Sequence, residues 1–229
     1  DTDIHDPTDA TLLQDGIIVI TRNLFRAKQL NPAPVFTFSD HNRAAQKKVL
    51  TIKNNGKKKR YKAYKSLLKL AANVENYAQN AIAVLDVYES ADPQDGIIAN
   101  MLAEQLKYYL DLFRKVISQT KRRVVHGEHV PTEEKIISLF ECHSDIIKKK
   151  NRETQFGHKV YITTGKSGLI LDCYLPRGNP SDSLVFPELL SRQKEVLNKT
   201  PRQMAADGGF SSKENLAKAQ EEGVKDMVF

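Results

Sequence analysis

The chain has 229 residues, of which 40% are hydrophobic, enough for one large core or a core with an insertion. Its formal net charge of +7 favours a polyanionic partner. No apolar run approaches the ~20 residues of a membrane span, and the acidic start is unlike a signal peptide. The two cysteines lack disulfide or zinc spacing, so we expect a cytoplasmic protein without membrane contact. Both ends resemble cuts, which favours an internal fragment.

The positive charge is concentrated in one segment. Between His41 and Val74 there are eleven basic residues and no acid, so the rest of the chain nets −4. Such a cluster suits phosphate contacts, although a solvated helix face is the commoner explanation of a single lysine run. Smaller clusters at Lys121–Arg123 and Lys148–Lys150 favour nucleic acid. The candidate DNA-binding residues are Lys57, Lys58, Lys59, Arg60, Lys62 and Lys65.

The sequence predicts helices in the first half of the chain. Residues 7–30 carry apolar side chains at helical spacing after a cap at Thr8 or Asp9, and two prolines follow. A weaker helix is expected over Thr37–Leu50. Two long amphipathic helices follow, with apolar stripes over Tyr61–Leu85 and Ile98–Val116. Their short polar connection predicts an antiparallel pair that packs as core.

After Pro131 the pattern changes to strands. Lys135–Glu141 is a short apolar run and predicts a strand, while Lys159–Thr164 and Leu169–Leu175 predict a β-hairpin around a glycine turn. Four further elements are expected to alternate: a helix over 186–197, a strand over 201–206, a helix over 211–222 and a strand over 224–229. This alternation favours a mixed sheet covered by helices.

The most informative site is Asp207. It is expected at the tip of a short strand, before a turn made by Gly208 and Gly209, with Ser211 or Ser212 capping the next helix. Open α/β sheets bind ligands at the carboxyl ends of their strands. Taken alone, an aspartate in this position is more often a turn or capping residue.

Several motifs occur together in a fixed order. They are Asp3–Leu13 (similar to "IHxPTDxxLL"), Gln155–Val160, Thr163–Gly168, Gly178–Ser183 and Asp207–Phe210. No one of them is specific, but the ordered set resembles the DDE transposases of bacterial insertion sequences, in particular the group catalogued as ISNCY. The resemblance covers the chain from Asp1 to Phe229.

The resemblance implies an RNase H-like fold in which two Asp and one Glu hold two Mg²⁺ or Mn²⁺ ions for DNA cleavage and strand transfer. Its second acid corresponds to Asp207. The first acid is implied before Asp1, so Asp1 and Asp3 are not assigned as catalytic, and the glutamate is implied beyond Phe229. DNA at transposon ends and target, and a homo-oligomer in the active complex, are the implied partners.

The expected architecture is therefore a mixed α/β, RNase H-like core, incomplete, with a large helical insertion. Residues 1–34 are expected to begin the catalytic core, 35–130 to form the basic helical insertion and 131–229 to continue the core. The alternative function is a non-catalytic nucleic-acid-binding module that uses the basic segment Arg43–Lys69 and needs no metal.

Other candidates weigh less. His126, His129, Cys142 and His143 match no zinc spacing. His158 is interpreted as a hydrogen-bonded surface histidine, with a role near the metal site as the alternative. Asp182 is interpreted as a helix cap.

Overall fold

The computed structural model describes residues 7–147 and 154–229. The chain divides into two compact units, one ending at Ser144 and the other beginning at Asp145. The first unit is helical and the second combines short strands with helices, so the chain is of mixed α/β class. The basic cluster Lys148–Lys150 and the start of the chain at Asp1 lie outside the described residues. Because the implied first acid closely precedes Asp1, we also expect Asp1 to lie near Asp207, and this expectation is therefore not tested.

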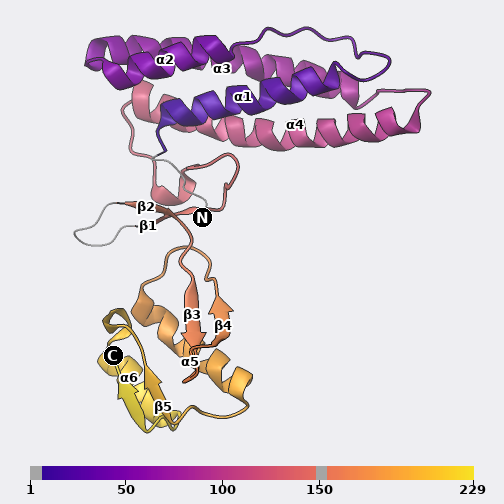
Figure 1. Cartoon of the computed structure of the whole chain (residues 1–229). Helices are drawn as coiled ribbons and strands as arrows, with labels where there is room; N and C mark the ends of the chain where they lie inside the picture. The colour runs from indigo at the N-terminus through magenta and orange to yellow at the C-terminus, as the bar shows by residue number, and fades with distance from the viewer. Residues whose placement is uncertain (1–6, 148–153) are drawn as a thin grey trace. The chain divides into compact units, whose positions relative to one another are not determined.

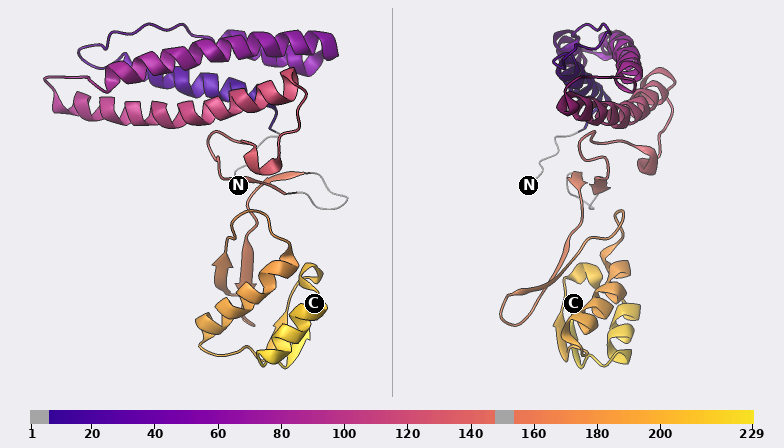
Figure 2. Two further views of the ribbon diagram at one scale, coloured as in Figure 1. Left: turned by 180° about the vertical axis from the view of Figure 1, so that it is seen from behind. Right: turned by 90° about the vertical axis from the view of Figure 1, so that its right-hand side faces the viewer.

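From Pro7 onward, the first unit is a bundle of four helices: α1 (Asp9–Ala27), α2 (Asn42–Asn54), α3 (Lys57–Leu85) and α4 (Pro93–Thr120). A π-helical turn, η1 (Lys121–Val125), and a 3-10 turn, η2 (Thr132–Glu134), follow α4. The bundle is seen nearly end-on in the right view of Figure 2. Each large apolar side chain that the bundle buries contributes about 1.5–3 kcal/mol. Fully buried are Leu13, Ile17, Ile20, Leu24, Leu67, Leu85, Leu102, Leu106, Phe113 and Leu139.

The predicted antiparallel pair is confirmed as α3 and α4, which pack against each other. The Asp92 side chain accepts from the Gln94 amide at 2.8 Å and so caps α4. The weaker helix begins later than expected, at Asn42, because the Asp40 side chain accepts from the Asn42 amide at 2.8 Å. The first helix is expected from the sequence to begin the catalytic core, but α1 packs against α2, α3 and α4 within the helical unit.

The start of α1 is fixed by residues of the Asp3–Leu13 motif. Thr8 and Thr11 form a capping box. Asp9 is only 5% exposed, and its carboxylate lies 2.9 Å from Arg123 and accepts from the Gln119 amide at 3.0 Å. This buried carboxylate joins the N-terminus of α1 to the end of α4. The motif therefore has a structural explanation in this unit.

The described residues of the second unit form six short strands and two helices. They are β1 (Asp145–Ile147), β2 (Gln155–Gly157), β3 (Tyr161–Thr164), β4 (Ile170–Tyr174), α5 (Asp182–Leu197), β5 (Gln203–Ala205), the 3-10 turn η3 (Gly208–Phe210), α6 (Lys213–Glu221) and β6 (Asp226–Val228). β1–β2 and β3–β4 are antiparallel, and β5–β6 is parallel with α6 as its crossover. The predicted hairpin and the final helix–strand–helix–strand order are confirmed.

Two expectations about strands are wrong. Residues 135–141 form no strand. The Gln119 side chain binds both backbone groups of Ile136, accepting from its amide at 3.0 Å and donating to its carbonyl at 3.2 Å, while Ile136 and Leu139 are buried in the helical core. In addition, we expect from the alternation one mixed sheet that includes the hairpin and has the strand before Asp207 at its centre, but β5 is not central and shares no sheet with the hairpin. The described strands form three separate pairs, so β5 has β6 as its one partner.

Helix α5 holds the second unit together. Phe186 and Leu190 of α5 pack with Ala219 of α6 and Val224, and Leu189 packs with Tyr161 of β3. Arg192 of α5 binds Asp172 of β4 through two hydrogen bonds of 2.7 Å each. Because side chains alternate along a strand, the opposite face of the strands is open, and Ile162, Ile170 and Val228 are exposed there.

Candidate functional site

Asp207 lies directly after β5. The Ala206 amide donates to the Val228 carbonyl at 2.8 Å, which extends the pairing with β6 to the residue before Asp207. The Asp207 side chain is exposed, and Oδ1 accepts from the Gly209 amide at 2.9 Å. Within the described residues it forms no ion pair. Asp207 is thus both the cap of a tight turn and an accessible carboxylate at the carboxyl end of a strand.

A second carboxylate, Asp182, lies beside this turn. A Cβ placed on Gly209 would lie 2.8 Å from Asp182 Oδ2 and 3.5 Å from Asp207 Oδ1. The distance between Asp182 Oδ2 and Asp207 Oδ1 therefore cannot exceed the sum of these two values. Asp182 Oδ1 accepts from Tyr161 Oη at 2.8 Å and from Lys159 Nζ at 3.1 Å. Burial and the neighbouring Asp182 carboxylate raise the pKa of Tyr161.

Asp182 is not the cap that the sequence suggested. Ser181 occupies the N-cap position of α5, and Asp182 is its first helical residue. Its carboxylate instead connects β3, through Tyr161, to the turn after β5. This contact was missed because Asp182 and Gly209 are far apart in the sequence. The motif Gly178–Ser183, which contains Asp182, was the available signal.

The two aspartates line a depression that we call the sheet groove. Its volume is about 840 Å³, and its walls are formed by Tyr161–Thr164 of β3 and Gln203–Ala205 of β5. The apolar side chains of Phe186 and Leu189 from α5 also line it. β3 is paired with β4 and β5 with β6, so each wall is a strand with one partner among the described residues. The groove thus combines strand edges, an apolar lining and the Asp207 carboxylate.

His158 also lines the sheet groove, and its Nδ1 lies 3.8 Å from Asp145 Oδ2. No three His, Cys, Asp or Glu side chains in the described parts of the chain are grouped so that they would hold a metal ion. In particular, His126, His129, Cys142 and His143 are not gathered into such a group. It also follows that Asp207 and the already paired Asp182 do not by themselves fit a Mg²⁺ site, which needs several oxygen ligands.

The predicted DNA-binding residues lie in the first half of α3. All six (Lys57, Lys58, Lys59, Arg60, Lys62 and Lys65) are exposed. Lys58, Lys62, Lys65 and Lys69 recur at spacings of four, three and four residues, so they share one face of the helix. Within the described residues these lysines form no ion pair. We call the exposed lysines and the arginine between residues 57 and 69 the basic face. They are Lys57, Lys58, Lys59, Arg60, Lys62, Lys65 and Lys69.

One observation separates the basic face from an ordinary solvated helix surface. Lys57–Arg60 occupy the first turn of α3, which contains no acid, although the positive end of the helix dipole disfavours cations there. Lys65 Nζ lies 4.8 Å from the ring of the half-exposed Tyr61. Arg60 has an additional structural role, since its Nε donates to the Ile52 carbonyl at 3.1 Å and so also caps the end of α2. Helix stability does not explain the rest of this charge.

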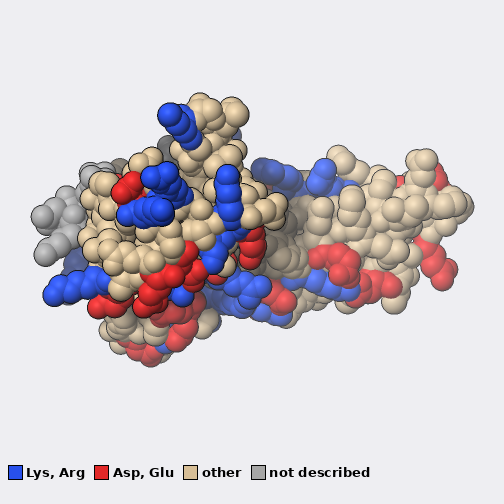
Figure 3. All heavy atoms as spheres, turned by 90° about the horizontal axis from the view of Figure 1, so that it is seen from below, with Lys and Arg blue, Asp and Glu red and all other residues tan. Residues whose placement is uncertain are grey.

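The surface in Figure 3 has a different character. There, Lys and Arg side chains are interspersed with Asp and Glu rather than gathered by sign. In the second unit several cations are neutralised by acids, for example Lys194 and Lys218 by Glu222, and Arg192 by Asp172. The basic face, by contrast, contains no acid between Lys57 and Lys69.

Comparisons with protein-family models, with curated proteins and with solved structures find no match to this chain. None of the helices in residues 7–147 and 154–229 has both the length and the apolar character needed to cross a bilayer.

Proposed function

We propose that this chain is part of the RNase H-like catalytic domain of a DDE transposase, and that the parent protein carries out Mg²⁺-dependent DNA cleavage and strand transfer. The observation that carries the proposal is the position of Asp207. It is an exposed carboxylate at the carboxyl end of a parallel strand, in a turn with two glycines, and it lines a groove.

The sheet groove supports this proposal because it suits one further strand. A strand lying between β3 and β5 would satisfy the free edge of each and join two pairs into one sheet. The resemblance implies that the first acid lies on a strand just upstream of the Asp3–Leu13 motif. If that strand ran in the direction of β5, its last residues would bring a second carboxylate toward Asp207.

In the parent, two metal ions would activate the attacking water or 3′-hydroxyl and stabilise the leaving oxygen. Of the residues described, Asp207 would supply one ligand, and the basic face would bind phosphates of the DNA. Because the acids present here do not complete a metal site, we expect the 229-residue chain alone to have no strand-transfer activity.

The test uses a longer protein that includes the flanking coding sequence. With Mg²⁺ or Mn²⁺ it should nick DNA carrying the element's ends, and Asp207→Asn should abolish nicking while leaving the fold intact. The matched control is Asp226→Asn, since Asp226 is an exposed aspartate of the neighbouring strand β6. Undiminished nicking by the Asp207→Asn protein would exclude Asp207 as a catalytic residue.

The second candidate function is a non-catalytic nucleic-acid-binding module. The basic face favours it, because unpaired cations at the positive end of a helix bind phosphate without any metal. This candidate predicts DNA binding that is insensitive to EDTA and no nicking by the longer protein under any metal condition.

A further inference from the structure

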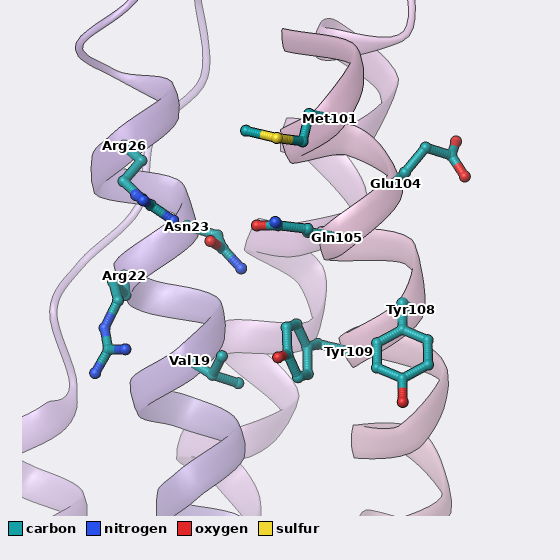
Figure 4. A pocket seen from close by; sticks show the side chains of 9 residues that line it. All are labelled: Val19, Arg22, Asn23, Arg26, Met101, Glu104, Gln105, Tyr108 and Tyr109. Atoms are coloured by element: carbon teal, nitrogen blue, oxygen red, sulfur yellow. The ribbon is translucent and has the colours of Figure 1, made fainter. Parts of the chain in front are cut away.

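The helical unit contains a second depression, between α1 and α4, which we call the helix groove. Its volume is about 500 Å³, and polar side chains from both helices line it. In Figure 4, Asn23 and Arg26 of α1 face Gln105 and Tyr109 of α4. No residue of the basic face or of the sheet groove belongs to it. It therefore has to be explained separately.

Several hydrogen-bonding groups that line the helix groove have no partner within residues 7–147. Asn23 is only 3% exposed, yet its side-chain amide forms no hydrogen bond within residues 7–147. The Gln105 amide, on the facing helix, is also without a hydrogen bond to the described chain. Neither amide is among the fully buried polar groups that lack a partner, so both open onto the space between the helices, although two amides facing each other would normally bond together. Here a space is left between them.

The same space receives further donors. The Tyr109 ring packs against Tyr108 and Phe140, but its hydroxyl has no hydrogen bond to the described protein. Arg22 and Arg26, one helical turn apart on α1, form no ion pair with any described acid. Arg26 is directed toward Asn23, whereas Arg22 extends along α1 and would have to change rotamer to reach the same point.

The acid lining the helix groove does not cancel this charge. Glu104 points away from α1 in Figure 4, and its carboxylate is 3.0 Å from Lys107 Nζ. Lys107 also pairs with Asp86 at 2.8 Å. The space between the helices therefore has an excess of positive charge and of N–H and O–H donors.

We propose that the helix groove binds a phosphate group, held by Arg26, Asn23, Gln105 and Tyr109, with Arg22 closing over it. A phosphate has several acceptor oxygens, a guanidinium matches two of them at once, and each amide supplies N–H donors. Bound phosphate would thus satisfy the groups that the protein leaves without partners. The phosphate can belong to a nucleic-acid backbone or to a small phosphate ester.

The test titrates the 229-residue chain with inorganic phosphate at constant ionic strength, with chloride as the reference anion. The side-chain amide signals of Asn23 and Gln105 in ¹H–¹⁵N spectra should shift and saturate with phosphate and not with chloride. Arg26→Gln and Gln105→Leu should each weaken binding about tenfold, as expected when one hydrogen bond to a charged group is removed. The control is Arg177→Gln, which removes an exposed arginine of the second unit that lies outside both grooves and outside the basic segment Arg43–Lys69.

Saturable binding that Arg26→Gln weakens and Arg177→Gln leaves unchanged would support the site. Equal weakening by both variants, or no saturable shift of the Asn23 and Gln105 signals, would overturn it. The source is then distinguished with a duplex DNA and a nucleoside monophosphate. If the DNA displaces phosphate and the monophosphate does not, the natural ligand is a nucleic-acid backbone. If the monophosphate displaces phosphate, the natural ligand is a small phosphate ester. Neither readout depends on nicking, so the transposase proposal can fail while this one stands.

Discussion

Asp182 and Gly209 are in such close contact that a single added methyl group on Gly209 would lie 2.8 Å from Asp182 Oδ2. The carboxylate cannot easily move aside, because its other oxygen is held by Tyr161 and Lys159. The absence of a side chain at Gly209 thus lets the N-terminus of α5 approach the turn that holds Asp207.

We therefore expect Gly209→Ala to destabilise the second unit by about 1–3 kcal/mol, the usual cost of forcing extra atoms into a packed site. Amide hydrogen exchange of β5 and α5 should accelerate correspondingly. Gly208→Ala is the matched control, since nothing lies within 4 Å of a Cβ at that position. Equal exchange in the two variants would show that the Asp182 contact does not restrain the turn.

The local elements of this chain were predictable, and the contacts between them were not. Proline and glycine positions, capping residues and apolar periodicity predicted all four bundle helices, the hairpin around Gly165–Gly168 and the strand before Asp207. The failure at residues 135–141 has a specific cause. An apolar run is buried equally well by a strand partner or by helices, and here the Gln119 side chain replaces the strand partner of Ile136.

In the candidate site, too, the local feature could be predicted from the sequence and the long-range contact could not. Asp207 was identified because its signal is local: a carboxylate followed by Gly208 and Gly209. Asp182 was misassigned because its role depends on a contact with Gly209, which short-range sequence patterns do not reveal. The helix groove was missed for a related reason. Asn23 and Gln105 look like ordinary polar residues until the packing of α1 on α4 brings them face to face.

A close helix contact gives a second prediction. Gly16 of α1 lies against Phe113 of α4, and a Cβ on Gly16 would overlap the fully buried Phe113 ring. Gly16→Ala should lower the free energy of unfolding of the helical unit by roughly 1–3 kcal/mol or more, although alanine favours helix. Gly96→Ala, in α4 with nothing within 4 Å of the new Cβ, should instead raise it by up to about 1 kcal/mol. Urea denaturation followed by helical circular dichroism measures both, and a stabilising Gly16→Ala would contradict the packing described.

A third prediction concerns pH. Hydrogen bonds from Lys194 and Lys218 lower the pKa of Glu222 from its ordinary value of 4.5 to about 2. A carboxyl group with a lowered pKa stabilises the fold above its unfolded pKa, and this contribution disappears as the pH falls through the folded pKa. The stability difference between the wild type and Glu222→Gln should thus be constant above about pH 5 and should shrink between pH 4.5 and 2. Carboxyl NMR titration measures the pKa directly. Glu221→Gln, which removes an exposed neighbour that forms no ion pair with the described residues, should show no such pH dependence.

The last prediction tests the basic face. If Lys57, Lys58, Lys59 and Arg60 bind phosphates, each bound phosphate releases counterions, and affinity for duplex DNA should fall steeply with salt and depend little on sequence. Replacing all four with Ala should reduce the slope of log K against log[salt] by roughly 0.9 for each phosphate that the variant no longer neutralises. The control needs the same change in net charge, because a less positive protein binds DNA more weakly wherever the charge is removed. Arg177, Lys199, Lys213 and Lys225 provide it, since all four are exposed in the second unit and none lines the sheet groove. Their replacement should lower affinity slightly and leave the slope nearly unchanged. If both quadruple variants change the slope equally, Lys57–Arg60 are a solvated helix surface and the DNA-binding residues must be sought elsewhere on the molecule.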